Sequence, residues 1–369
     1  MCAVIFVLFS VLWLYYFQAD LMAVTQHVLS HGQTVYHRSV GTAIVTLVLL
    51  LLQKGVQKVV KLHSSNHALT YFPSMLLLAM LTSGYPEKGS SMTMSYWYWL
   101  APLLLVLWGA LVWMIRAVQP YLQKSSLRLH ARAVWINILE MAIMIVGVNL
   151  ASNTNAVYHY RAHMETCLMK QQFDEALATG RRSLETDASL TMLRAYALSC
   201  KGELGERLFE YPVAGSGADL VPLDICKSRL LIYPCDSLYR HLGAIPRPNM
   251  DTPAYLAALE RGGQAKKSVG DYVLCGMLID RNLDDFAHTI GKYYDLTDSL
   301  TLPRHYREAL TLYVHRRSKP VVVYHHPVTE EDYRDLQELE AQYPSPDERK
   351  IRVMEKYQGS YWYYFEYVR

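Results

Sequence analysis

The sequence predicts an all-α protein in two parts, a set of N-terminal membrane helices followed by a soluble helical domain. Two observations carry this prediction. Apolar residues make up 51% of the 369 residues, and before Ser152 they gather into stretches that approach membrane-spanning length. After Ser152 they recur with a helical period in pairs of short segments. We therefore expect a transmembrane domain over 1–151 and a water-facing domain over 152–369.

About five apolar segments are expected to cross the membrane. Crossing takes about 20 apolar residues, or about 17 at the short end. The fourth and fifth segments meet that length, whereas the first three need flanking residues or a locally thin bilayer. The first lacks a preceding Lys or Arg and a small-x-small site, so we expect no signal-peptide cleavage; its abrupt start leaves room for earlier spans. The segments lie near 3–17, 40–52, 69–83, 97–115 and 133–151.

The charges of the connecting loops predict the orientation. Loops 53–68 and 116–132 carry three and four Lys or Arg residues, whereas loops 18–39 and 84–96 carry one each. Loops rich in Lys and Arg stay in the cytoplasm. The N-terminus is therefore expected inside and the C-terminal domain outside the cytoplasmic (inner) membrane. The assignment inverts if one short segment fails to cross.

Net charge separates the two parts and excludes one class of partner. Nine cations and three anions precede Ser152, which gives +6, and the remaining 27 cations and 30 anions give −3. No basic stripe dominates the second part, so we expect no nucleic-acid partner.

The soluble part contains helical pairs that resemble tetratricopeptide (TPR) repeats. Residues 173–187 read FDEALATGRRSLETD, in which Phe173, Ala176 and Ser183 take the aromatic and small positions of a second TPR helix. Ala188 stands where the pattern has Pro. Turns at 171–172 and 202–203 lie 31 residues apart, near the TPR period of about 34. Further helices are expected at 190–201, 204–210, 272–280, 283–294, 306–315, 334–342 and 347–356, with a Pro- and Gly-rich break near 211–253.

Three segments carry a wider resemblance: QADLMAVTQHVLSHGQT (18–34), LPRHYREAL (302–310) and GSYWYYFEYV (359–368). With the helical pairs, they resemble an uncharacterised family of multi-spanning bacterial, Bacteroidetes-like membrane proteins with TPR-like C-terminal domains. The resemblance implies a location in the bacterial envelope. It transfers no reaction and no catalytic residue.

The loop after the first span contains the first candidate site. If 20–31 is helical, Asp20, His27 and His31 share one face, and the two histidines have the spacing of a metal-binding pair. Three readings stay open: a polar helix at the membrane surface, a metal site, or a catalytic site. Membrane glycosyltransferases that use polyprenyl-linked sugars place an acid in the first external loop, where Asp20 would act as general base.

The fifth span contains the second candidate site. Asn137 and Glu140 lie three residues apart on one helix face. Ionisable groups at membrane depth are costly and are commonly functional. Glu140 is therefore interpreted either as a structural partner of another span or as a transport residue.

Cysteine usage gives no sign of a disulfide framework. Five of the six cysteines lie in the soluble part, and an odd number cannot all pair internally. Cys226 and Cys235 are close enough for a loop disulfide, and the others are expected as buried thiols.

The leading functional hypothesis is a non-enzymatic membrane anchor whose TPR-like domain binds a protein or peptide on its concave face. Tyr160 and Arg194 are the candidate contact residues. The alternative is a glycosyltransferase-like envelope enzyme that uses Asp20, and a transporter component ranks lowest. No nucleotide-binding, P-loop, esterase or zinc-protease motif occurs, so we expect no cofactor and no metal.

Overall fold

The computed structural model describes residues 1–62, 64–84, 86–87, 91–92, 96–122, 129–223, 230–296 and 302–368. Over these residues the regular secondary structure is helical except for one antiparallel ribbon, in which β1 (Pro86–Glu87) pairs with β2 (Ser91–Met92). The all-α prediction is confirmed for the described chain. The chain divides into two compact units, Met1–Ala162 and His163–Arg369.

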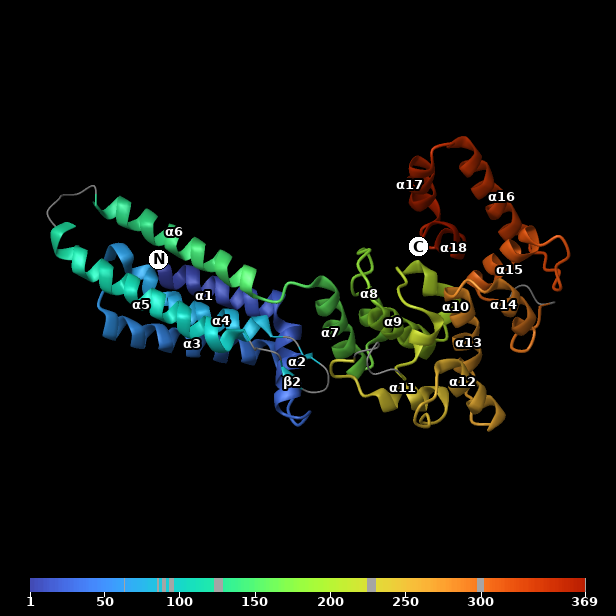
Figure 1. Ribbon diagram of the computed structural model, residues 1–369, viewed down its shortest axis with the longest axis horizontal. Helices are drawn as coiled ribbons and strands as arrows, with labels where there is room; N and C mark the ends of the chain where they lie inside the picture. The colour runs from blue at the N-terminus through green and yellow to red at the C-terminus, as the bar shows by residue number, and fades with distance from the viewer. Residues whose placement is uncertain are drawn as a thin grey trace. The chain divides into compact units, whose positions relative to one another are not determined.

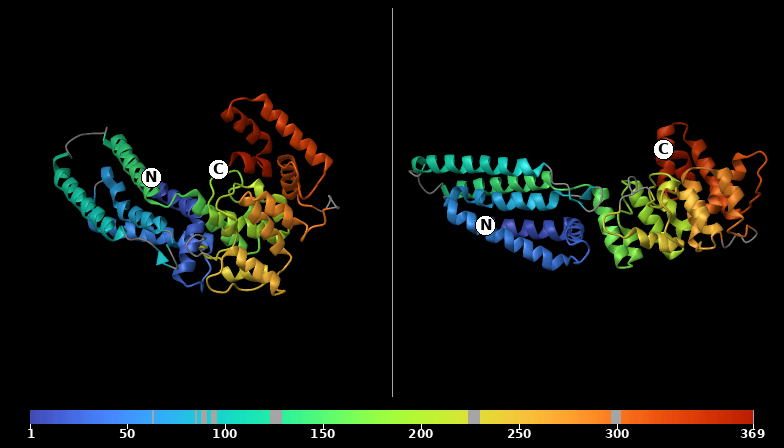
Figure 2. Two further views of the ribbon diagram at one scale, coloured as in Figure 1. Left: turned by 45° about the vertical axis from the view of Figure 1, so that its right-hand side comes forward. Right: turned by 60° about the horizontal axis from the view of Figure 1, so that its bottom comes forward.

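The first unit is a bundle of antiparallel helices (Figure 1). Successive long helices run in opposite directions, so every second connection lies at the same end of the bundle (Figure 2). The central layer is a 3₁₀ segment that continues directly into an α-helix, and α6 packs along both. The helical elements are α1 (Cys2–Leu12), the π-helical η1 (Trp13–Phe17), α2 (Ala19–Leu29), α3 (Arg38–Val60), the 3₁₀ helix η2 (Ser64–Tyr71), α4 (Phe72–Ser83), α5 (Trp97–Leu122) and α6 (Leu129–Ala151).

Three of these helices are long and apolar enough to cross a membrane: Arg38–Val60, Trp97–Val118 and Ala133–Ala151. The count rises to four if Cys2–Phe17 and Ala19–Leu29, which meet at 74°, form one broken span. The number is thus lower than the expected five. Two predicted segments account for the difference. The segment at 3–17 passes only together with Ala19–Leu29 as a bent pair, and the α-helix α4 of the segment at 69–83 has only 12 residues, about 18 Å.

The outer surface of the first unit is apolar, and several polar side chains lie in its interior among apolar ones. On α3, Thr42, Thr46 and Gln53 are buried, whereas Val40 and Leu51 on the opposite face are 57% and 63% exposed. Gln53 donates to the Thr70 hydroxyl at 3.0 Å. A water-soluble bundle has a mainly polar surface instead, because large exposed apolar surface is unfavourable in water.

The second unit is built from short helices joined by tight turns. Its helices are the C-terminal part of α7 (Ala156–Met169), α8 (Phe173–Ala178), α9 (Ala188–Lys201), α10 (Leu204–Arg207), α11 (Cys235–Leu242), α12 (Thr252–Arg261), α13 (Ser268–Ile279), α14 (Leu283–Ile290), α15 (Arg304–Arg316), α16 (Pro327–Gln342), α17 (Pro346–Tyr357) and α18 (Tyr361–Tyr367). Two 3₁₀ turns, η3 (Leu208–Glu210) and η4 (Gly217–Leu220), complete it.

Three helix pairs in this unit use the same turn. At the end of α7, α9 and α13 one residue takes the left-handed conformation, and the following amide closes a six-residue hydrogen-bonded ring. The left-handed residues are Gln171, Gly202 and Arg281, with φ of 58°, 72° and 57°. The closing bonds run from Gln172 N to Cys167 O, Glu203 N to Leu198 O and Asn282 N to Met277 O, at 2.9–3.0 Å.

TPR repeats are not confirmed, although the paired helices are. The best sequence match fails within its own helix: α8 ends at Ala178 and Gly180 has a φ of 61°, so Ser183 lies outside the helix. The packing also differs from that of a repeat array, in which each repeat contacts only its neighbours, because α10 packs on α13 and α15 as well as on α9. The shared turn makes antiparallel pairs, and the second helices are too short to stack as a solenoid.

The two C-terminal landmarks of the sequence meet in the core of this unit. Glu308 of α15 is 3% exposed and accepts hydrogen bonds from His305 Nδ1 (3.0 Å), Arg304 Nε (2.8 Å) and the Tyr361 amide (2.7 Å). Trp362 Nε1 donates to the Glu308 carbonyl at 2.8 Å. LPRHYREAL therefore anchors the aromatic terminal helix α18 on α15, which gives both landmarks a structural role.

Candidate functional site

The structure places Asp20 on α2 beside Arg38. Their side chains form an ion pair at 3.7 Å, and the Arg38 guanidinium lies 5.5 Å from the centre of the Tyr15 ring. The pair joins the first turn of α2 to the first turn of α3, across the loop that the sequence predicts to be external. Asp20 therefore has a cationic neighbour that fixes its position.

The expected alignment of Asp20, His27 and His31 on one helix face is wrong. α2 ends at Leu29, and His31 has a left-handed φ of 51°. The His27 ring instead packs toward Gly32, where a Cβ would lie 3.2 Å from it. Among the described residues, the two histidines are not part of a group of three metal-ligating side chains.

Asn137 and Glu140 hold the 3₁₀ helix η2 in the centre of the bundle. The Asn137 amide oxygen accepts from the Ala68 amide at 2.7 Å, and its nitrogen donates to the Ser65 carbonyl at 3.2 Å. The Glu140 carboxylate accepts from Asn66 Nδ2 at 3.1 Å. Asn66 is the residue with non-helical backbone angles in η2. Two side chains of α6 thus satisfy the polar groups that the irregular segment exposes.

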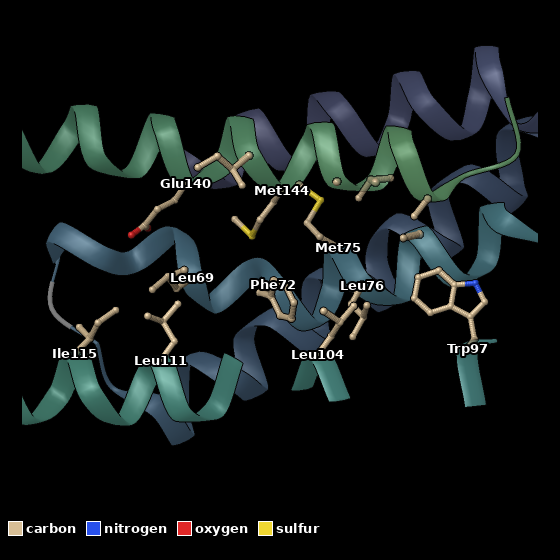
Figure 3. Close-up of a pocket in the computed structure, with 15 residues that line it drawn as sticks. Leu69, Phe72, Met75, Leu76, Trp97, Leu104, Leu111, Ile115, Glu140 and Met144 are labelled. Carbon is tan, nitrogen blue, oxygen red and sulfur yellow. The ribbon is translucent and has the colours of Figure 1, made fainter. Parts of the chain in front are cut away.

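A cavity of about 530 Å³ opens between α4, α5 and α6, with Glu140 at one end (Figure 3). Trp97 lies at the opposite end, and Phe72, Met75 and Met144 lie between them. Among the described lining residues Glu140 alone is ionisable. Its second carboxylate oxygen is buried without a hydrogen bond in the described chain. The cavity suits a hydrocarbon chain and offers almost no polar contact.

The two candidate partner-binding residues lie in different units. Tyr160 of α7 is partly exposed in the first unit. Arg194 of α9 is 1% exposed in the second. The Arg194 guanidinium donates to the carbonyls of Gly180 and Pro212 at 3.4 Å and lies 5.2 Å from the Tyr211 ring centre. The Arg194 side chain therefore packs in the core of the second unit and presents no surface to a partner.

A second cavity, of about 450 Å³, lies on the surface of the second unit. Its base is formed by Tyr255 and Leu259 of α12, which are 2% and 3% exposed. Ile245, Arg247 and Met250 line it from the preceding loop, and Arg261, Gly262 and Gln264 line it from the end of α12. We call this the α12 pocket.

A hydrogen bond from the base and a close backbone approach fix the walls of the α12 pocket. Burial raises the pKa of Tyr255 to about 12, so its hydroxyl stays protonated and donates to the Ala244 carbonyl at 2.5 Å. Gly243 has a φ of 149°, and a Cβ there would lie 2.1 Å from the Gln264 carbonyl oxygen. Only glycine lets the two walls approach this closely.

The rim of the α12 pocket is cationic. Arg247 and Arg261 are exposed, and neither forms an ion pair with any residue that the structure describes. Arg240, Lys266 and Lys267 add exposed positive charge near by in the sequence. Arg261 Nε donates to the Ala257 carbonyl at 3.3 Å, which leaves its terminal N–H groups for a ligand. A pocket with an apolar base and two such guanidinium groups on its rim suits a carboxylate-bearing ligand, because guanidinium binds carboxylates through paired N–H donors.

Sequence reasoning did not single out this pocket. Its residues fall at the edge of the Pro- and Gly-rich break, which the sequence presents only as an interruption of helical pairs. One signal was present: RGGQAKK (261–267) places three cations within seven residues. The missing information was that the loop carrying Arg247 folds back against this segment.

Cysteines form no disulfide among the described residues. Cys2, Cys167, Cys200, Cys235 and Cys275 are free thiols. Cys226, the suggested partner of Cys235, lies outside the described residues.

The bundle and the helical unit together define an all-helical protein that includes helices of membrane-spanning length. A family model matches residues 82–248 and 247–368, and its description is a family of unknown function (DUF6057). The chain belongs to this family. No curated protein and no solved structure matches it.

Proposed function

We propose that the protein is an integral membrane protein whose bundle crosses the bilayer five times and anchors the second unit at the membrane surface. The apolar outer surface of the bundle supports the membrane location. Besides the three long helices, two further segments would each cross the bilayer once: α1 together with η1, and η2 together with α4. The 8 residues of η2 and 12 of α4 extend about 34 Å at rises of about 2.0 and 1.5 Å per residue, which exceeds the hydrocarbon thickness of about 30 Å.

The proposed η2–α4 crossing meets the main requirement for irregular backbone in a bilayer. Such backbone is tolerated only where protein covers it. Ala68, Leu69 and Thr70 of η2 are buried. Residues 65–67 are partly exposed, and α6 supplies hydrogen bonds to this part of η2 from Asn137 and Glu140. A 3₁₀ segment in this position is therefore compatible with membrane depth.

The distribution of cations favours an orientation with the N-terminus in the cytoplasm and the second unit outside it. Lys54 and Lys58 lie in the last turns of α3, and Lys61 follows that helix. Arg116 lies near the end of α5, at the same end of the antiparallel bundle. Arg38, at the start of α3, belongs to the opposite end. The positive-inside rule assigns the end with more cations to the cytoplasm.

The second unit is proposed to bind an acidic segment of a protein or peptide partner in the α12 pocket. The single observation that carries this proposal is the pair of arginines, Arg247 and Arg261, over an apolar base formed by Tyr255 and Leu259. An acidic side chain or a chain terminus would meet the guanidinium groups, and a neighbouring apolar side chain would cover the base.

The binding proposal is tested with short fluorescent peptides of matched length, rich in Asp and Glu, in Gln and Asn, or in Lys. Purified full chain in detergent should bind the acidic set, more weakly at high salt. Each exposed charge pair contributes up to about 1 kcal/mol, so Arg247→Ala with Arg261→Ala should lower the affinity about tenfold to thirtyfold.

The matched control removes two arginines elsewhere. Arg334 and Arg352 are exposed and lie near acids of their own helices. Arg334→Ala with Arg352→Ala changes the net charge equally and should leave binding within about twofold. Equal binding of all three peptide sets, or equal losses in both double variants, would contradict the α12 pocket as the site.

Protease protection tests the orientation. Protease added to spheroplasts should digest the second unit, and protease added to inverted vesicles should leave it intact. Digestion only in inverted vesicles would place the unit in the cytoplasm and reverse the topology.

The alternative role, an envelope glycosyltransferase-like enzyme with Asp20 as base, has its own test. Asp20→Asn should abolish an envelope-glycan phenotype at normal protein level if that role is correct. Arg38→Gln is the comparison, because it removes the ion-pair partner but keeps the acid. A phenotype that follows Arg38→Gln as strongly as Asp20→Asn would indicate a structural pair.

A further inference from the structure

The hairpin of α7 and α8 brings together three side chains with metal-ligand chemistry. His163 and Cys167 lie one helical turn apart on α7, and Glu175 lies on α8. Their ligand atoms all fall within 4.8 Å of one another. All three residues belong to the second unit, and this group is separate from the α12 pocket.

The spacing of the first two atoms fits a tetrahedral metal. His163 Nε2 and Cys167 Sγ are 3.6 Å apart. Zn–N and Zn–S bonds of about 2.0–2.1 and 2.3 Å at a tetrahedral angle put nitrogen and sulfur about 3.6 Å apart. The same distance also suits a thiol–imidazole hydrogen bond, so the third residue decides between the two readings.

The turn between the helices fixes the third residue. Left-handed Gln171 and the bond from Gln172 N to Cys167 O at 3.0 Å close the hairpin. Glu175 follows on the first turn of α8 and faces the Cys167 side of α7. Its carboxylate is exposed, whereas Cys167 is 3% exposed. The group therefore has a buried sulfur and an open side toward solvent.

We propose that His163, Cys167 and Glu175 bind one Zn²⁺ ion. Thiolate, imidazole and carboxylate together are a donor set that Zn²⁺ accepts in four-coordinate sites. Binding displaces the Cys167 thiol proton to solvent, and the sulfur, the imidazole nitrogen and one carboxylate oxygen each donate an electron pair to the ion. Water from the exposed side fills the fourth position.

Co²⁺ substitution tests the site. Full chain, purified with its affinity tag removed and dialysed against chelator, is titrated with Co²⁺ and then Zn²⁺. The expected result is one ion per chain, with a thiolate-to-Co²⁺ charge-transfer band that Zn²⁺ abolishes. Absence of that band would overturn the proposal and leave a thiol–imidazole hydrogen bond.

The variants identify the ligands. Cys167→Ser should remove the band, whereas Cys200→Ser should keep it. Cys200 is the matched control because its sulfur also lies near a histidine, His241 Nδ1 at 3.9 Å, but the two belong to no group of three ligands among the described residues. A band lost in Cys200→Ser and retained in Cys167→Ser would refute the assignment.

A variant of the exposed residue Glu175 tests the site without disturbing the fold. Glu175→Gln changes a solvent-facing side chain, so the helices should stay intact by circular dichroism. Zn²⁺ affinity should fall at least about tenfold, since loss of even an outer hydrogen-bond partner costs that much. Unchanged affinity in folded Glu175→Gln would exclude the three-residue site.

Discussion

Glu165 joins α7 to the loop before α11, and its replacement should destabilise the second unit. The carboxylate is 0% exposed. One oxygen accepts from the amides of Leu231, Ile232 and Tyr233 at 2.8, 2.7 and 2.8 Å, and the other accepts from Leu231 at 2.9 Å. Three consecutive backbone donors thus converge on one buried charge.

The size of the effect follows from these bonds. A hydrogen bond to a charged group contributes about 1.5–3 kcal/mol, against about 0.5–1.5 kcal/mol for a neutral one. Glu165→Gln keeps one acceptor oxygen but turns the other into a donor that faces the Leu231 amide. A loss of about 1 kcal/mol at each of three amides gives about 3 kcal/mol. In a unit of this size, that lowers the unfolding temperature by about 6–12 °C.

Hydrogen exchange and thermal unfolding of the full chain in detergent measure the effect. Exchange at Leu231, Ile232 and Tyr233 should accelerate in Glu165→Gln, because these amides lose their charged acceptor. Glu185→Gln is the control, since Glu185 is exposed and should leave both readouts unchanged. Wild-type exchange at the three amides together with a wild-type unfolding temperature would refute the reasoning.

Two further predictions concern other buried contacts. Burial acts to raise the pKa of Glu308, but the hydrogen bonds from His305 and the Tyr361 amide and the charge of Arg304 hold it below its ordinary value. The stability that the Glu308 carboxylate contributes is therefore complete above the unfolded pKa of about 4.3 and is lost as pH falls through the lower folded pKa. Glu308→Gln should make the unfolding temperature less dependent on pH over that acid range. A pH profile unchanged from wild type would contradict this. Gly217→Ala should cost about 1–3 kcal/mol, because its Cβ would lie 2.5 Å from the Gly276 carbonyl oxygen; Gly291→Ala, with open space around it, should unfold within about 0.5 kcal/mol of wild type by denaturant titration.

Local signals predicted the helical pairs well. The turns at 171–172 and 202–203, found from their spacing, both adopt the same left-handed closure, and Arg281 repeats it. Such turns depend on a few consecutive residues and their backbone angles, so the sequence contains most of the information. Residues 334–342 and 347–356 likewise lie within α16 and α17.

Predictions failed where a distant contact replaced a local one. The segment predicted at 69–83 begins within the 3₁₀ helix η2, which is held by contacts such as that of Asn66 with Glu140, 74 residues away, and no local pattern contains that information. The prediction that Asp20, His27 and His31 share one helix face failed for a local reason, because α2 ends at Leu29 and His31 lies beyond the helix. Arg194 was expected to contact a partner on the surface of the second unit, but the carbonyls of Gly180 and Pro212 accept hydrogen bonds from its buried guanidinium.

The candidate sites show the same division. His27 and His31 have the spacing of a metal pair, as His163 and Cys167 do. For the first pair the sequence leaves a metal site as one of three readings, and it predicts no metal overall. Among the described residues, only the second pair has a third side chain with metal-ligand chemistry close by, because the α7–α8 turn brings Glu175 beside it. The α12 pocket likewise depends on a loop that folds back to bring Arg247 to the same cavity as Arg261.

The sequence by itself determined that the chain is helical, where its apolar helices lie and which turns pair the short helices. Those properties follow from the period of apolar residues and from backbone conformation over a few residues. Only the tertiary structure decided which polar groups meet: Asn137 with η2, Glu165 with the amides of Leu231–Tyr233, and Glu308 with α18. These contacts join residues 53 to 72 positions apart, and packing selects them among many alternatives that the linear order leaves equally possible.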